Sequence, residues 1–219
     1  MIQRNVSPFT YANILLNRIL ERAWEWRLGI DSCGTVKAEQ MGLRSDAVDY
    51  CPIPFRGFFQ AMKHVPRELQ TGTFLDYGSG KGRALVLAAR YHNFRRVIGV
   101  EMSSDLCEQA KRNLRHASPG RVEIVCSDAA AYQPPSDVTV FFLFNPFFGE
   151  TMEMVVHNLR KSLAQNPRRA AIVVCNPRNF KAAADAQDWY EERAAGKVPP
   201  SLSWHVFITR AVVRDAEVA

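Results

Sequence analysis

The stretch that decides the fold is residues 74–83, which read FLDYGSGKGR. An apolar strand pattern ends at an acid, Asp76, and runs into a glycine-rich turn, after which a helical pattern begins. Glycine lets the backbone approach a ligand closely, and the start of a helix presents free N–H groups. The stretch therefore predicts a strand–turn–helix unit whose turn binds a ligand.

Two phosphate-binding motifs do not fit this turn. A P-loop needs Ser or Thr after the lysine and a glycine five positions before it, but these places hold Gly82 and Asp76. A dinucleotide fingerprint that starts at Gly78 needs its third glycine where the chain has Arg83. The acid at the strand end would repel a pyrophosphate, whereas its carboxylate suits a cationic group such as the ammonium of a methionine moiety.

Two further acids end the next two predicted strands. Glu101 closes the apolar run 97–101, about 20 residues after the turn, where an acid accepts hydrogen bonds from a ribose diol. Asp128 follows the run 124–126 and is placed to accept from an adenine amino group. Each acid alone is also typical of a solvated strand end or a helix cap. Three acids that each end a successive strand argue against that interpretation, and the acid at the first strand end favours S-adenosylmethionine (AdoMet) over NAD as the ligand.

Downstream of residue 73, short apolar runs alternate with helical patterns, which indicates βαβ units and a mostly parallel sheet. Helices are predicted over 82–91, 104–116 and 150–164, the second with Ser104 or Asp105 as N-cap. Strands are predicted over 73–76, 96–101, 122–126, 138–144 and 170–175. The last part is less regular: we interpret 182–190 as helical and 204–213 as a late strand that enters the sheet antiparallel.

The N-terminal part has a different pattern. Residues 10–28 predict a helix, ended by a glycine, and residues 55–65 predict a second helix closed by a proline, with a loop and one helical turn between them. The first helix carries its apolar residues on or near one face: Tyr11, Ile14, Leu15, Ile19, Trp24 and Leu28. We therefore divide the chain into an N-terminal helical cap, 1–66, and a ligand-binding domain, 67–219.

Composition limits the function further. The chain has 219 residues, 47% of them hydrophobic, which suits one α/β domain. An odd count of five cysteines without a C-x-x-C pair argues against a disulfide framework, and the five scattered histidines predict no metal site. With no signal-type start or bilayer-length apolar run, we expect a cytoplasmic protein without a membrane partner. The net charge of +6 permits a polyanionic partner without requiring one.

Over roughly residues 73–176 the chain resembles the class I AdoMet-dependent methyltransferases. The resemblance rests on the family's first motif, its ribose-binding acid and its adenine-contacting segment: Asp76, Gly78 and Gly80; Glu101; and Asp128 with Ala129. It implies a Rossmann-like α/β fold with a mostly parallel seven-stranded sheet, a late antiparallel strand, helices on both faces and an N-terminal helical extension. It also implies AdoMet as methyl donor and S-adenosyl-L-homocysteine as product.

More narrowly, the sequence looks like a poorly characterised bacterial group of these enzymes, and more distantly like the Dot1-type and related lysine methyltransferases. In such enzymes the segment before the first motif folds over the cofactor, which places Tyr50 near AdoMet. The full set expected to bind the cofactor is Tyr50, Asp76, Tyr77, Gly78, Ser79, Gly80, Glu101, Met102, Asp128, Ala129 and Asn145.

The candidate catalytic residues Asn145, Pro146 and Phe147 follow the fourth predicted strand. That strand ends at the same sheet edge as the glycine turn. An asparagine oxygen can accept the N–H hydrogens of an acceptor amine, and Phe147 can stack on a flat acceptor or enclose a cationic one. The segment resembles the N-P-P-Y motif of amino-methylating enzymes but lacks one proline. A strand-ending turn is the alternative interpretation, which we prefer for the similar segment 176–178.

Three functions remain open at this point. The first is N-methylation of a protein side chain or a small molecule, by a monomer or a homodimer. The second is methylation of RNA or DNA, which the pI of about 9.2 allows. The third is a non-catalytic binding module that keeps the AdoMet fold.

Overall fold

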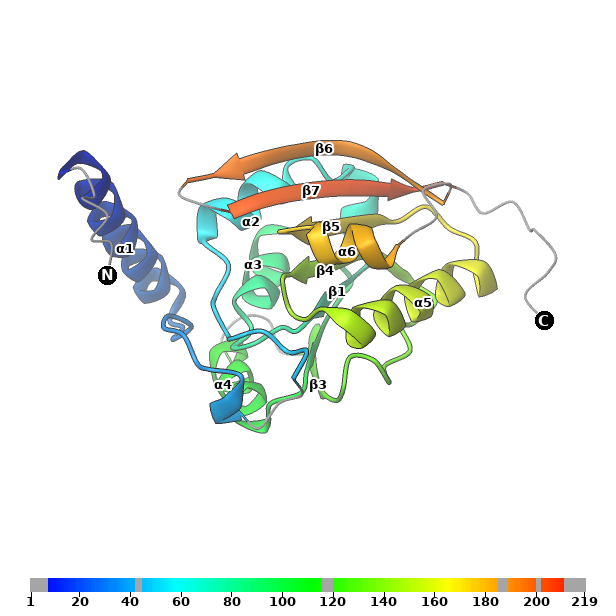
Figure 1. Ribbon diagram of the computed structural model, residues 1–219, viewed down its shortest axis with the longest axis horizontal. Coiled ribbons are helices and arrows are strands. Elements are labelled where there is room, and N and C mark those ends of the chain that lie inside the picture. The colour runs from blue at the N-terminus through cyan, green and yellow to red at the C-terminus, as the bar shows by residue number, and fades with distance from the viewer. Residues whose placement is uncertain (1–7, 42–44, 116–119, 185–188, 200–201, 211–219) are drawn as a thin grey trace.

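A computed structural model describes residues 8–41, 45–115, 120–184, 189–199 and 202–210 (Figure 1). Its centre is a seven-stranded sheet with the order β3-β2-β1-β4-β5-β7-β6. Strands β1 to β5 pair in parallel, and β7 pairs antiparallel with both β5 and β6. The strands are β1 (Thr73–Tyr77), β2 (Arg96–Glu101), β3 (Val122–Cys126), β4 (Val138–Phe144), β5 (Ala171–Cys175), β6 (Tyr190–Val198) and β7 (Leu202–Thr209).

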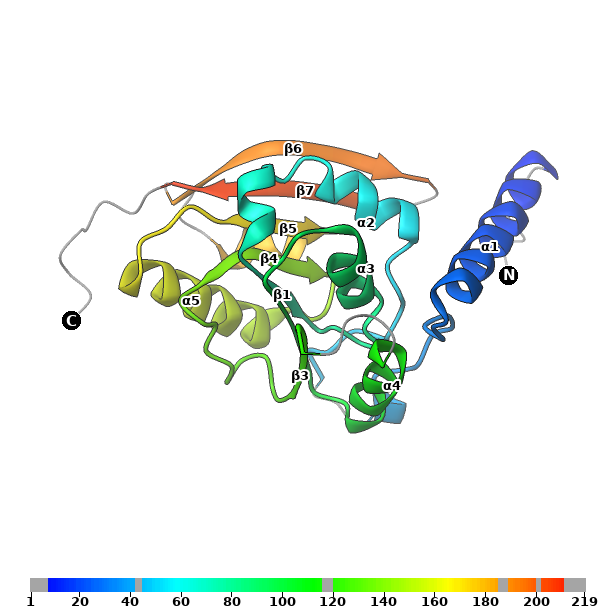
Figure 2. The same ribbon diagram turned by 180° about the vertical axis from the view of Figure 1, so that it is seen from behind.

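Helices cover both faces of the sheet. Figure 1 shows α5 (Gly149–Gln165) and α6 (Arg178–Ala183) in front of it, and Figure 2 shows α2 (Phe55–Met62) and α3 (Arg83–Tyr91) on the other side. Each face has its own hydrophobic cluster. Because side chains alternate along a strand, β1 sends Phe74 to one cluster and Leu75 to the other. The Rossmann-like α/β fold predicted from the sequence is confirmed.

The sequence located five strands within one residue at each end but missed β6. The helix predicted over 182–190 is found only at its start: α6 ends at Ala183, residues 185–188 lie outside the described ones, and Tyr190 already begins β6. Strand β6 lies at the edge of the sheet, and most of its residues between the two ends are exposed, so it carries no apolar run for a sequence pattern to detect. Strand β7 confirms the late strand and its antiparallel direction, but it begins at Leu202 and ends at Thr209, and residues 211–213 of the predicted range lie outside the described ones.

Two local predictions need correction in and near α4 (Ser104–Leu114). The N-cap is Ser103 rather than Ser104 or Asp105, and its hydroxyl oxygen accepts from the Leu106 backbone N–H at 3.4 Å. Helix α4 also packs along β3, and a disulfide joins Cys107 to Cys126 with a Cα–Cα distance of 6.2 Å. The cysteine count gave no sign of this pair, because 19 positions separate the two residues and only the fold brings them together.

The N-terminal part begins with α1 (Pro8–Leu28), which projects from the body of the molecule in Figures 1 and 2. Of its predicted apolar face, Leu28 is buried and Trp24 half-buried, while Leu15 and Ile19 are exposed. The side chains of residues 11 and 14 lie outside the described ones. The one helical turn expected in the following loop is η1 (Glu39–Met41).

Helix α2 ends three residues earlier than predicted and is followed by η2 (Arg67–Thr71). Its Phe58 and Met62 are fully buried and belong to the cluster that also contains Phe74 and Leu85. The division into 1–66 and 67–219 stays a prediction, although both parts contribute to this one core.

Candidate functional site

A pocket opens at the carboxyl ends of β1, β2 and β4, where the sequence predicted the ligand. Among the residues that line it, eleven were predicted: Tyr50, Asp76, Gly78, Ser79, Glu101, Met102, Asp128, Ala129, Asn145, Pro146 and Phe147. Two predicted residues, Tyr77 and Gly80, are not among its lining. Carboxyl ends of parallel strands meet at one edge of a sheet, which is why residues far apart in the chain gather here.

The glycine turn is shaped by main-chain geometry. Gly78, Gly80 and Gly82 have φ values of 70°, 55° and 80°, which side chains rarely adopt. A Cβ at Gly78 would collide with Pro146, and one at Gly80 would collide with the Tyr50 ring. Gly80 therefore belongs to the site by its backbone, although it does not line the pocket.

Asp76 is the most unusual acid in the pocket. Its side chain is 3% exposed and has no hydrogen-bond partner among the described residues. Burial raises the pKa of this carboxyl well above its usual range, and the neighbouring charge of Glu101 raises it further. The hydroxyl of Ser79 is likewise buried without a partner. Buried polar groups are normally satisfied, so this corner fits a ligand that brings a cation and a hydrogen-bonding group.

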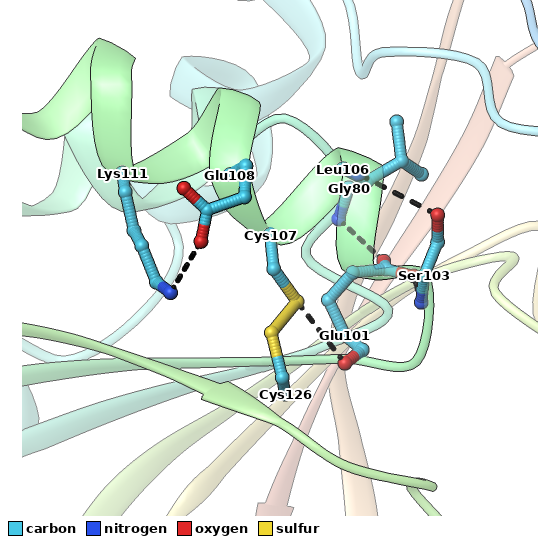
Figure 3. The surroundings of a disulfide bond; sticks show 8 residues. All are labelled: Gly80, Glu101, Ser103, Leu106, Cys107, Glu108, Lys111 and Cys126. Carbon is cyan, nitrogen blue, oxygen red and sulfur yellow. Dashed lines mark hydrogen bonds and ion pairs between the residues drawn. A yellow bond between two sulfur atoms is a disulfide. The ribbon is translucent and has the colours of Figure 1, made fainter.

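Glu101 is held by the backbone around it (Figure 3). One carboxylate oxygen accepts from the Gly80 N–H at 2.8 Å, and the other accepts from the Ser103 N–H at 2.9 Å. Burial raises the pKa of Glu101, while these backbone hydrogen bonds act in the opposite direction. Carboxylate oxygens have several lone pairs, so both can still accept from a ligand hydroxyl.

Asp128 occupies the end of β3 as predicted. One of its oxygens accepts from the Ala130 N–H at 2.8 Å, which orients the half-buried carboxylate. Ala129 is buried beside it, and Met102 is exposed at the rim of the pocket.

Tyr77 was predicted to bind the cofactor, but the structure places it in the core. Its side chain is fully buried within the cluster under α5, with its ring 6.3 Å from that of Tyr132. Alternation along β1 explains this, because Asp76 and Tyr77 are neighbours and must point to opposite faces of the sheet.

A segment that sequence reasoning largely missed forms a wall of the site. Residues 46–53 line the pocket, and of these only Tyr50 was predicted. The segment pairs with the loop after β4: the Val48 N–H donates to the Pro146 carbonyl at 3.3 Å, and the Phe148 N–H donates to the Asp46 carbonyl at 3.0 Å. Because main-chain atoms make this pairing, no pattern of side chains in the sequence predicts it.

The two Asn-Pro segments of the chain differ in what they do. Asn145 and Asn176 both have positive φ, 46° and 56°. The Asn176 side-chain oxygen accepts from the Ser203 N–H and hydroxyl, at 3.3 and 3.2 Å, which makes it part of a turn, as we interpreted 176–178. The Asn145 side chain has no hydrogen bond within the described residues and lines the pocket.

Arg83, at the start of α3, anchors the N-terminal part to the site. It is 3% exposed, pairs with Glu21 and with Glu25 at 3.2 Å, and donates to the Ile53 carbonyl at 2.9 Å. Its guanidinium also lies 4.1 Å from the centre of the Phe55 ring. The sequence contained no sign of this role, because the two acids precede Arg83 by about 60 positions.

Within the described ranges, no group of three or more His, Cys, Asp or Glu side chains is placed to hold a metal ion. Groups of the pocket that could contact an organic cofactor include the carboxyls at the strand ends and the bare backbone of the turn.

Comparison with known proteins agrees with this geometry. Residues 74–166 match the family described as a methyltransferase domain. A protein-lysine N-methyltransferase from Saccharolobus islandicus (strain REY15A) is 27% identical over 124 residues, which span 55% of this chain and 73% of that protein.

Solved structures share the fold. An RNA methyltransferase from Salinibacter ruber, in complex with S-adenosyl-L-homocysteine, superposes with a TM-score of 0.55 at 21% identity, over 75% of this chain and 97% of that one. A ribosomal protein L11 methylase from Lactobacillus delbrueckii subsp. bulgaricus gives a TM-score of 0.53 at 9% identity, over 70% and 77% of the two chains. The matched domain, the fold and the pocket together resemble those of the class I AdoMet-dependent methyltransferases.

Proposed function

We propose that this methyltransferase acts on nitrogen, with the amine of a protein side chain or of a small molecule as acceptor. AdoMet supplies an electrophilic methyl group on a sulfonium. In our proposal Asp76 pairs with its ammonium, Glu101 accepts from the ribose hydroxyls and Asp128 accepts from the adenine amino group. The observation that carries the choice of nitrogen is the unpaired Asn145 amide in the wall of the pocket.

Asn145 would orient the acceptor rather than react. During transfer the nitrogen lone pair forms the new N–C bond, the S–C bond breaks with its electrons staying on sulfur, and positive charge develops on nitrogen. An amide oxygen that accepts an N–H hydrogen holds the lone pair in line and stabilises that charge. A lysine acceptor must first lose its proton, since only the neutral amine has a lone pair to donate.

The charges of the pocket support an amine over a nucleic acid. Five acidic side chains are among its lining residues, Asp46, Asp49, Asp76, Glu101 and Asp128, of which Asp49 is paired with Lys37 at 2.7 Å. The cation among the described lining residues is Arg83, and its charge is already compensated by two glutamates. A polyanionic strand would be repelled by such a lining, while a cationic side chain would be attracted. The resemblance to a protein-lysine N-methyltransferase favours the same choice.

Replacing Asn145 with glycine tests this assignment. Glycine removes the amide but tolerates the positive φ, so the loop keeps its shape. We expect kcat to fall about a hundredfold, because the acceptor loses its orienting group, while AdoMet affinity barely changes. Tritium transfer from labelled AdoMet to lysine-rich histone would measure turnover, and calorimetry would measure AdoMet binding.

Asn176→Gly is the matched control. It also removes an asparagine of positive φ from an Asn-Pro segment, but it should lower the melting temperature and leave kcat intact, because its amide bonds Ser203. Equal losses of AdoMet affinity and turnover in Asn145→Gly would contradict the orienting role.

Methylation of nucleic acid is the second candidate, favoured by the net charge of +6. It predicts RNA or DNA binding that weakens steeply as salt rises. A gel shift without binding at low ionic strength would exclude this candidate.

We also propose the cytoplasmic location that we expected from the sequence.

A further inference from the structure

Helix α1 is fixed to the body by one side only. Near its C-terminal end Leu28 is buried and Trp24 stacks on Phe55 with ring centres 5.5 Å apart. Glu21 and Glu25 point the same way and pair with Arg83. We call the side of the helix opposite these contacts its outer face; the helix projects away from the body in both views (Figures 1 and 2).

That outer face is apolar. Five side chains form it: Leu15, Leu16, Ile19 and Leu20 are between 50% and 57% exposed, and Trp26 is 88% exposed. At 100° per residue they fall within a single arc of about 140°. Single exposed apolar residues are ordinary, but a contiguous group of large ones marks an interaction surface.

The charges beside this face are all positive. Arg18, Arg22 and Arg27 are exposed, and of these only Arg22 has a partner in the described part of the chain, Glu25 at 3.4 Å. The two acids of residues 15–28 are the ones turned inward to Arg83. At the same 100° per residue, Arg18 and Arg22 lie on one side of this apolar arc and Arg27 lies within it. Residues 15–28 hold no free acid on this face.

The exposed apolar side chains and the arginines together indicate what kind of partner binds this face of α1. A second copy of the same face would bring arginines against arginines, which costs free energy. An anionic lipid surface satisfies every group at once: the aliphatic side chains enter the acyl boundary, and the indole and guanidinium groups lie at the headgroups. No helix within the described residues is long and apolar enough to cross a bilayer, so such binding would be peripheral.

We propose that the outer face of α1 binds an anionic phospholipid surface. This departs from our expectation of a protein without a membrane partner, which rested on the lack of a spanning segment. It does not depend on the identity of the methyl acceptor.

Co-sedimentation of the full chain with vesicles of phosphatidylcholine, alone or mixed with phosphatidylglycerol, tests the proposal. We expect binding to the anionic vesicles that weakens with salt. Replacing Leu15, Ile19 and Leu20 together with glutamine should lower the partition coefficient at least roughly tenfold. Each Arg→Gln change at 18, 22 or 27 should lower it about fivefold, the equivalent of ~1 kcal/mol.

The matched control removes an exposed apolar residue and an exposed cation from the far side of the molecule, Met154→Gln with Lys161→Gln on α5. It should bind vesicles like the wild type, and circular dichroism should show that every variant keeps its helices. Absence of binding to anionic vesicles at low salt would overturn the proposal, as would equal losses in the control and the α1 variants. A dimer in light scattering that the apolar triple variant abolishes, without vesicle binding, would assign the face to a second copy instead.

Discussion

Asp76→Asn is expected to weaken AdoMet binding at least about a hundredfold and, in the same protein, to raise the stability of the ligand-free enzyme. The binding loss follows because the carboxylate is our proposed partner for the cofactor ammonium, and truncating one member of a buried charge pair costs 2–5 kcal/mol or more. The stability gain follows because this carboxyl is 3% exposed and unpaired without ligand. A neutral amide avoids the cost of burying that charge, which we place at roughly 1–3 kcal/mol.

The gain has a definite pH dependence. The folded-state pKa of Asp76 lies above its ordinary value of 3.8, so the folded protein holds this proton more tightly than the unfolded chain does. The stability that protonated Asp76 contributes is fully present below the pKa of this group in the unfolded chain. It is lost as the pH rises through the pKa of the same group in the folded protein. Asp76→Asn removes this loss, so its advantage in melting temperature should grow with pH across that window.

Glu101→Gln is the control for this experiment. Its carboxylate accepts from two backbone N–H groups, and an amide NH₂ would face one of them, so this variant should be less stable than the wild type. Thermal melts of both variants over a pH series, with calorimetry of AdoMet binding, would separate them. Wild-type AdoMet affinity in Asp76→Asn would refute the role given to Asp76.

Arg83→Met is expected to destabilise the protein by about 3–5 kcal/mol, because it removes the buried cation that pairs with Glu21 and Glu25. Among the described residues, buried Glu25 is then left with only the exposed Arg22 at 3.4 Å as a cationic partner. Methionine keeps the apolar contact with Phe55, so the loss reports the charge and hydrogen bonds rather than an empty space. Urea unfolding would measure it. Adding Glu25→Gln to Arg83→Met should restore part of the stability, since the uncompensated charge is then gone.

Arg96→Met provides the comparison. Arg96 pairs with Glu123 at 2.6 Å, but both side chains are more than 40% exposed, so its removal should cost at most about 1 kcal/mol. Similar losses in Arg83→Met and Arg96→Met would show that the buried network does not hold the N-terminal part in place.

The sequence predicted the sheet well because its central strands are buried on both faces and read as continuous apolar runs. The glycine turn and the acids at the strand ends were predictable for a related reason, since topology alone carries strand ends to one edge. Strand β6 escaped prediction because an exposed edge strand has no such run.

The rest of the site depends on contacts between distant segments. Tyr77 shows why a neighbour of a site residue in the sequence need not belong to the site. It follows Asp76 in the chain, but its side chain packs on the opposite face of the sheet. The links from Arg83 to Glu21 and from Val48 to Pro146 each span many tens of positions. A single sequence does not specify such pairs, because no local period relates their members.

The pairing of residues 46–50 with the loop after β4 has a consequence for how this enzyme can change its substrate. Peptide groups, rather than side chains, fasten the two segments, through Val48 to Pro146 and Phe148 to Asp46. Mutations of Ala47 and Val48 can therefore reshape one wall of the pocket while these main-chain bonds stay in place, whereas the Asp46 carboxylate also accepts from the Thr151 N–H at 3.0 Å. In our proposal the methyl donor is held by Asp76, Glu101 and Asp128, which lie outside this segment, so changes at Ala47 and Val48 could alter acceptor preference while those three carboxyls stay in place.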